Sequence, residues 1–211
     1  AVQAVPDVVS YNAAISACGK GGQWQLAVSL FGRMPSARLV QDTISFSAAV
    51  SACENVEQWG QALALLQSML DEELLPNMFT FSAAISACEK GRQWWQALSL
   101  LEQAHAQALV PNIVACNAAV RACQQASQAA RALRLVAGMK RWGLQPDALT
   151  FLAAVDACEA GLRGREVLPL LQDAAQEAAR GLSSLPSNAR LKGSGAALRR
   201  EVATAKEPWL R

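Results

Sequence analysis

The side chains best suited to chemistry in this sequence are six cysteines and one histidine, which could bind a metal, form disulfides or act as nucleophile and base. Five of the cysteines stand 35 residues apart, at Cys18, Cys53, Cys88, Cys123 and Cys158. Neither a zinc site nor a disulfide framework requires so even a spacing. His105 has no cysteine or carboxylate cluster beside it in the sequence and offers no Ser-His or Cys-His couple. We therefore expect packing cysteines, no catalytic residues, no bound metal and no cofactor.

The composition indicates a folded chain rather than a disordered or strongly basic one. Of the 211 residues, 52% are hydrophobic and 17% are charged, and the formal net charge is +2. A histone-like binder would carry a much larger positive charge. The longest uncharged stretch is too polar for a membrane-spanning helix, so we expect no membrane partner. The first residues lack the order of a signal peptide, and we expect a fragment or a processed product.

The 35-residue period extends to other residue types and indicates a repeated helical hairpin. Aromatic residues recur at Tyr11, Phe46, Phe81 and Phe151, and tryptophans recur at Trp24, Trp59 and Trp94. Within one period the apolar spacing is helical twice, since Tyr11 and Ile15 open one stripe and Trp24 and Ala27 open another. Glycines mark the turn inside a hairpin and prolines mark the joins. Such hairpins bury their apolar stripes by stacking, which predicts an all-α solenoid.

The same period sets the expected organisation of the chain. Residues 1–7 match the end of a period, and we expect them to be the tail of a preceding repeat. The full repeats are expected at 8–42, 43–77, 78–112 and 113–147, followed by a degenerate repeat at 148–182. Residues 183–211 are basic, and we expect a mostly disordered tail with a short helix near 196–205.

One repeat pattern resembles this unit closely. The first hairpin begins with Val-Val-Ser-Tyr-Asn-Ala-Ala-Ile at 8–15, places Cys-Gly-Lys at 18–20, and continues with Ala-Val-Ser-Leu-Phe at 27–31 and Met34. Pro-Asp or Pro-Asn stands at the joins. The pattern is similar to that of the pentatricopeptide repeat family, in its P-type form of 35-residue repeats. The resemblance covers residues 1 to about 182 and implies a right-handed superhelix of stacked helix-turn-helix units.

The resemblance also implies a function, the binding of single-stranded RNA with one base per repeat. In the family, the second residue of each repeat packs against the bases. The corresponding residues here are Val9, Ile44, Phe79, Val114 and Leu149. The fifth and last residues of a repeat contact the base edge. These pairs are Asn12 with Asp42, Ser47 with Asn77, Ser82 with Asn112, and Asn117 with Asp147.

By the family's correspondence, Asn with Asp favours uracil and Ser with Asn favours adenine, so the expected core is U-A-A-U, read 5′ to 3′ from the amino end. The fifth repeat places Leu152 and Leu182 at the reading positions, and we assign it no base. Family members place a lysine near the phosphates at the end of the first helix, which implies this role for Lys20 and Lys90. The resemblance further implies a monomer in a chloroplast or mitochondrion that serves RNA stability, processing or translation, with other RNA-processing proteins among its partners.

Each of these residues also has a simpler explanation. Asp and Asn are favoured just before a helix because they cap its free N–H groups. The apolar second residues could belong to the core, and the two lysines could be solvated turn residues. A helical scaffold that binds proteins, or a spacer within a longer array, would have the same periodicity. The sequence leaves open the target transcript, the number of repeats in the full-length protein and any effector domain outside this chain.

Overall fold

A computed structural model of the chain describes residues 7–54, 58–160, 169, 172 and 176. The chain divides into two compact units, residues 1–171 and 172–211, and helices α1 to α9 all lie in the first. The expected tail at 183–211, its helix near 196–205, residues 1–6 and nearly all of 161–182 lie outside the described residues. The described part contains helices and no strand. It also contains no helix with the length and apolar character needed to cross a bilayer.

The helices alternate between two kinds along the chain. The first helices of successive hairpins are α1 (Val8–Lys20), α3 (Thr43–Glu54), α5 (Met78–Lys90), α7 (Ile113–Gln125) and α9 (Ala148–Ala160). The second helices are α2 (Trp24–Arg33), α4 (Trp59–Asp71), α6 (Trp94–Ala106) and α8 (Ala129–Arg141), and a 3-10 turn, Pro35–Ala37, follows α2. The first helices thus begin 35 residues apart, at 8, 43, 78, 113 and 148.

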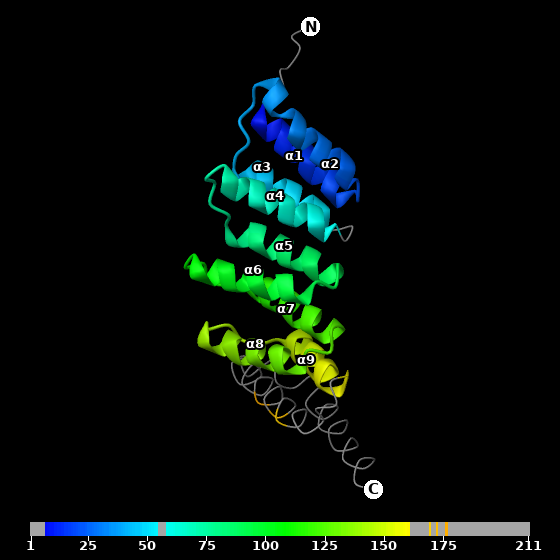
Figure 1. The fold of residues 1–211 in the computed structure, drawn as a ribbon, viewed down its shortest axis with the longest axis vertical. Helices are drawn as coiled ribbons and strands as arrows, with labels where there is room; N and C mark the ends of the chain where they lie inside the picture. The colour runs from blue at the N-terminus through cyan, green and yellow to red at the C-terminus, as the bar shows by residue number, and fades with distance from the viewer. Residues whose placement is uncertain (1–6, 55–57, 161–168, 170–171, 173–175, 177–211) are drawn as a thin grey trace, which may run out of the picture. The chain divides into compact units, whose positions relative to one another are not determined.

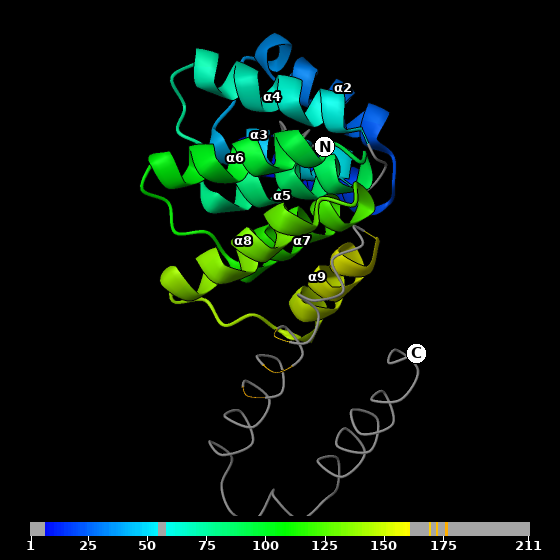
Figure 2. The same cartoon turned by 60° about the horizontal axis from the view of Figure 1, so that its bottom comes forward.

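The two kinds of helix form two layers in the first unit. Each first helix packs against the first helices before and after it, and each second helix packs against the first helices of its own and the next hairpin. Figures 1 and 2 show α1, α3, α5, α7 and α9 in one layer and α2, α4, α6 and α8 in the other. A first helix inside the stack is therefore enclosed on three sides, and ten residues of α5 are buried. Only its remaining side faces solvent.

Small residues allow the first helices to lie close together. Alanines on the touching sides are fully or almost fully buried, among them Ala49, Ala52, Ala84, Ala87, Ala119 and Ala122. At Gly19 the approach leaves no room for a side chain, since an added Cβ would lie 2.9 Å from both Cα and Cβ of Ala52. Larger side chains at these places would push the helices apart. The alanine and glycine content of the first helices thus sets the spacing of the stack.

Large side chains fill the space between the two layers. Phe46, Phe81, Met34, Met69 and Met139 are all at most 1% exposed. Four of the five repeated cysteines are buried in this core and Cys18 packs against it partly buried. Burial raises the pKa of Cys53 to about 11 and that of Cys88 to about 12. These thiols stay protonated at neutral pH and are poor nucleophiles and poor metal ligands. The cysteines therefore act as packing residues.

The close contact at Gly19 gives a first prediction. We expect Gly19→Ala to destabilise the chain by about 1–3 kcal/mol, because its Cβ meets backbone that no side-chain rotation can move. Gly32→Ala in α2 is the matched control, since nothing lies within 4 Å of its added Cβ, and we expect it to stabilise by up to about 1 kcal/mol. Urea unfolding measures both. Equal stability of the two variants would contradict the role of Gly19.

Candidate nucleic-acid interface

The solvent-facing side of the first helices carries a row of exposed apolar side chains. They are the predicted base-packing residues, and their exposed fractions are 73% for Val9, 65% for Ile44, 59% for Phe79, 57% for Val114 and 58% for Leu149. Because one stands at the second residue of every first helix, the row repeats at each step of the stack. Scattered exposed apolar residues are normal, but a row at one position of successive repeats is not. The alternative that these residues belong to the core is wrong.

The predicted base-reading pairs lie beside this row, because the fifth residue follows the second by three on the same helix face. Asn12 Nδ2 donates to Asp42 Oδ1 at 3.5 Å. Asn117 Nδ2 lies 3.3 Å from Asp147 Oδ1 and 3.1 Å from Asp147 Oδ2. Residues 30 positions apart in sequence are thus brought together at the join between two hairpins.

The two Ser/Asn pairs differ from each other. The Ser82 hydroxyl lies within reach of two acceptors, 2.7 Å from the Met78 carbonyl oxygen and 3.2 Å from Asn112 Oδ1. The Ser47 hydroxyl lies 2.6 Å from the Thr43 carbonyl oxygen and 2.7 Å from Thr80 Oγ1. No hydrogen bond in the described residues joins Ser47 directly to Asn77. Three of the four predicted pairs therefore touch directly.

The last residue of each repeat also caps the next first helix. Oδ1 of Asp42, Asn77, Asn112 and Asp147 accepts the backbone N–H three residues on, at 2.8 to 3.0 Å. Capping and pairing coexist because a single oxygen accepts both hydrogen bonds: Oδ1 of Asp42, Asn112 and Asp147 accepts the capped N–H and also the pairing donor. A cap fixes Oδ1 as the acceptor, so the Nδ2 amino groups of Asn77 and Asn112 point away from the helix end. Capped asparagines thus offer a donor, whereas capped aspartates offer a second carboxylate oxygen.

The two aspartates of these pairs are ionised at neutral pH. Partial burial raises the pKa of Asp42, but hydrogen bonds from Ser45 and Asn12 outweigh it and hold the pKa below the ordinary value of 3.8. The pKa of Asp147 is lowered in the same way, against its partial burial, by Thr150 and Asn117. An ionised carboxylate only accepts hydrogen bonds. The partner asparagine must therefore turn its Nδ2 toward the carboxylate.

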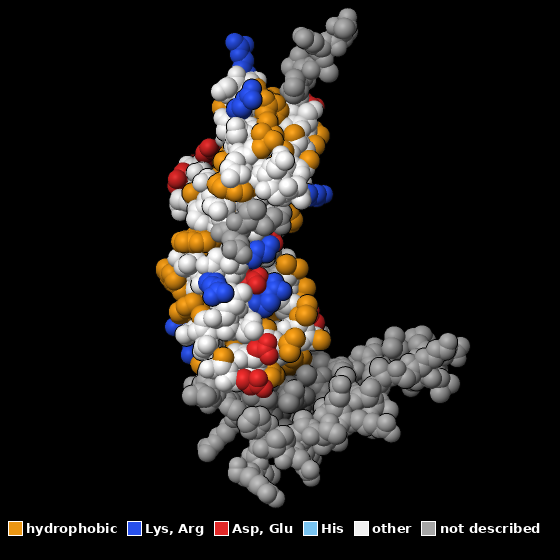
Figure 3. Space-filling view, turned by 90° about the vertical axis from the view of Figure 1, so that its right-hand side faces the viewer, with side chains coloured by type: hydrophobic (Ala, Val, Ile, Leu, Met, Phe, Trp, Pro, Cys, Tyr) orange, Lys and Arg blue, Asp and Glu red, His pale blue; other side chains and the backbone are white. Residues whose placement is uncertain are grey.

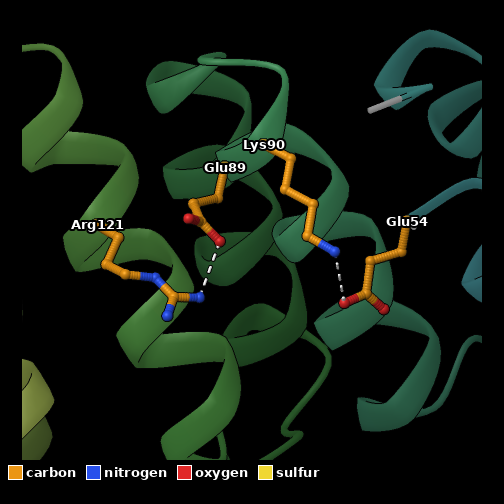
Figure 4. Close-up of polar contacts among 4 residues, drawn as sticks. All are labelled: Glu54, Glu89, Lys90 and Arg121. Atoms are coloured by element: carbon orange, nitrogen blue, oxygen red, sulfur yellow. Dashed lines mark hydrogen bonds and ion pairs between the residues drawn. The ribbon is translucent and has the colours of Figure 1, made fainter. Parts of the chain in front are cut away.

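The predicted phosphate contacts are in different electrostatic surroundings. Lys20 is exposed, and no ion pair to it occurs among the described residues. Lys90 Nζ lies 3.6 Å from Glu54 Oε1 of the preceding first helix, beside a second pair in which Arg121 Nη2 lies 2.9 Å from Glu89 Oε2 (Figure 4). On the face seen in Figure 3, basic and acidic side chains are interspersed. A phosphate would compete with Glu54 for Lys90.

The fifth repeat lacks the polar pair in its described part. Leu152 stands at the reading position of α9 and is 59% exposed. A leucine side chain offers no hydrogen bond to a base edge. Leu182, its predicted partner, lies outside the described residues.

Two further sets of residues at the joins, one buried and one exposed, were not singled out from the sequence. Thr80 and Thr150, each third in its first helix, contact the reading residues of the preceding repeat. Val40, Leu75 and Val110, two residues before the capping positions, are 81%, 78% and 68% exposed. In both cases the signal was the same 35-residue spacing that revealed the pairs. The described residues hold no group of three or more His, Cys, Asp or Glu that could bind a metal.

Comparisons with known proteins agree with this architecture. The family model described as "Pentatricopeptide repeat-containing protein" matches residues 11–139. No curated protein sequence matches the chain. Among solved structures, the PPR domain of Arabidopsis thaliana protein-only RNase P 1 in complex with tRNA has a TM-score of 0.72 at 14% identity, over 92% of this chain and 96% of that one.

A second similar structure is the maize pentatricopeptide repeat protein PPR10, with a TM-score of 0.64 at 26% identity, over 95% of this chain. PPR10 in complex with an 18-nt psaJ RNA element has a TM-score of 0.66 at 22% identity. The chain spans 27% of the first PPR10 chain and 29% of the second. The predicted all-α solenoid is confirmed. Since the family model covers more than half of its residues, the chain belongs to the pentatricopeptide repeat family.

Proposed function

We propose that this chain binds single-stranded RNA along the exposed side of its first helices, one base per repeat over the first four repeats. The observation that carries the proposal is the regular alternation, along that side, of an exposed apolar residue with a polar pair at each join, three of the four pairs being directly hydrogen-bonded. A base needs a surface to stack on and a polar group that matches its edge. Solved structures of the two similar proteins contain tRNA and psaJ RNA, which supports the same class of ligand here.

The hydrogen-bonding groups left free by capping support the expected core U-A-A-U. Uracil presents an N–H donor at N3, which suits the second carboxylate oxygen of Asp42, and that of Asp147, which can accept a second hydrogen bond besides the one from Asn117 Nδ2. Adenine presents an acceptor at N1, which suits the free Nδ2 of Asn77 and Asn112. The Asn/Asp pairs thus present an acceptor to the base edge, whereas the Ser/Asn pairs present a donor. A peptide ligand would not require this alternation.

The family resemblance suggests the setting of this activity. We propose that the bound RNA is an organellar transcript, in a chloroplast or mitochondrion, and that occupancy of the strand protects it from nucleases or prevents an inhibitory hairpin. Four bases specify a short site, so longer recognition requires further repeats. A fluorescent fusion of the full-length protein tests the location.

The base assignment predicts a designed change of specificity. Fluorescence anisotropy with short unstructured RNAs should show a preference for U-A-A-U over scrambled RNA and over DNA. In the double variant Ser47→Asn and Asn77→Asp, a donor at the second base edge is replaced by an acceptor. The variant should therefore bind U-U-A-U about tenfold more tightly than U-A-A-U. Ser68→Asn on the exposed side of α4 is the control and should change nothing. Equal binding of all oligonucleotides by the wild type would overturn the assignment.

The exposed apolar row predicts a loss of binding without a loss of stability. Phe79→Ala should weaken binding of U-A-A-U about 5- to 150-fold, since stacking on an aromatic ring contributes about 1–3 kcal/mol per base. Trp95→Ala is the matched control, because Trp95 is equally exposed, at 58% against 59%, but lies in α6 of the other layer. Both variants should melt at similar temperatures. An equal loss of affinity in Trp95→Ala would contradict the proposal, because it would place RNA on the layer of second helices.

The ion pair of Lys90 predicts a variant that binds more tightly than the wild type. Glu54→Gln removes the carboxylate that competes with phosphate, so affinity should rise up to about fivefold at low salt. The dependence of log affinity on log salt should also steepen by up to about 0.7, the value for one phosphate of a single strand. Adding Lys90→Gln to this variant should abolish both effects. An unchanged salt dependence in Glu54→Gln would exclude Lys90 as a phosphate contact.

A further inference from the structure

We propose that the reading unit is a triad, in which a threonine of the following repeat fixes the orientation of the two residues that contact the base. The positioning residues are Thr80 for the second base and Thr150 for the fourth. This inference rests on the proposed RNA binding and adds to it a determinant of base specificity. The inference arises from the contacts at two joins, where Thr80 and Thr150, each third in its first helix, contact both residues of the preceding pair.

The contacts at the fourth pair show the triad most completely. Thr150 is fully buried, and its hydroxyl lies 2.5 Å from Asn117 Oδ1 and 2.9 Å from Asp147 Oδ1. Asn117 Nδ2 in turn approaches both oxygens of Asp147. Three side chains from two repeats thus meet at this join, where the single Thr150 hydroxyl hydrogen can be donated to Asn117 Oδ1, the nearer acceptor, or to Asp147 Oδ1.

This arrangement fixes which way the Asn117 amide faces. The ionised Asp147 requires a donor and so takes Nδ2, which leaves Oδ1 toward the Thr150 hydroxyl. Reversing the amide would place its oxygen against a carboxylate. One hydrogen of Asn117 Nδ2 remains for the base. Its direction is fixed because Asp147 contacts the nitrogen of the amide and Thr150 contacts the oxygen. Because the amide is ordered before the base arrives, less conformational entropy is lost on binding.

At the second pair, Thr80 contacts both side chains of a pair that has no direct hydrogen bond of its own. Thr80 is fully buried, and its Oγ1 lies 2.7 Å from the Ser47 hydroxyl and 3.1 Å from Asn77 Oδ1. Ser47 and Asn77 share no direct hydrogen bond in the described residues. Thr80 therefore connects the two side chains that are proposed to read one base.

The first and third pairs have no threonine at this position. At the first join, the Ser45 hydroxyl contacts Asp42 at 2.8 Å, and Asn12 Oδ1 is buried without a hydrogen-bond partner. The Asn12 to Asp42 contact is also the longest of the direct pairs, at 3.5 Å. At the third join the position is occupied by Ala115, which has no hydroxyl. We therefore expect sharper base preference at the second and fourth bases than at the first and third.

The test compares base preference rather than total affinity. Anisotropy is measured with RNAs that carry each of the four bases at the fourth position, and with a second set that varies the first position. Thr150→Val should reduce the preference for U at the fourth base about three- to tenfold and leave the first base unchanged. Thr150→Ser, which keeps the hydroxyl, should restore the preference. Thr43→Val is the matched control, because no hydrogen bond to the Thr43 hydroxyl occurs among the described residues.

Several outcomes would overturn the inference while leaving RNA binding intact. If Thr150→Val kept the wild-type preference, or weakened all RNAs equally, Thr150 would be a helix-capping residue only. Should that variant fail to fold, Ala115→Thr gives the reverse test: buried threonines fit the same position at 80 and 150, and the added hydroxyl should sharpen the preference at the third base. An unchanged third base would contradict the triad. A wild-type chain without any base preference would instead refute the proposed function, and the triad with it.

Discussion

The close contact between neighbouring first helices is the constraint on which the other features depend. Alanines on the touching sides, and Gly19 against Ala52, let these helices lie side by side. That spacing brings the fifth residue of one repeat within hydrogen-bond distance of the residue that caps the next first helix. It also leaves one side of each first helix without a neighbour, where the second residue becomes exposed. The packing of the first helices, the pairing of polar residues at the joins and the exposure of the second residues therefore follow from one helix arrangement.

The capping residues connect stability to recognition. Each Asp or Asn at a join satisfies a backbone N–H that would otherwise lack a partner, and this fixes the orientation of its side chain. What remains free is a carboxylate oxygen in one case and an amino group in the other. At equivalent positions of successive repeats, Asp42 thus offers an acceptor and Asn77 offers a donor. Under the proposed base assignment, a residue needed for the helix end would also distinguish two bases.

Much of the fold could be predicted because its signal is periodic. Five cysteines at a constant spacing, with aromatic and tryptophan residues at the same interval, were enough to predict stacked helical hairpins. The base-reading pairs came from the family resemblance, and their role in this chain stays a prediction. Sequence could not decide whether Val9 or Phe79 was buried, because a periodic apolar residue suits a core equally well. The Thr150 contacts and the Glu54 to Lys90 ion pair depend on distances between repeats, which one sequence does not contain.

The central claim is that successive bases lie against successive first helices. Photo-crosslinking with 4-thiouridine placed at either the first or the fourth base of U-A-A-U tests it most directly, because such crosslinks form only at short range. We expect the first base to crosslink to peptides around Val9 and Ile44, and the fourth to peptides around Val114 and Leu149. Crosslinks to α2, α4, α6 or α8, or the same peptides from both RNAs, would contradict it.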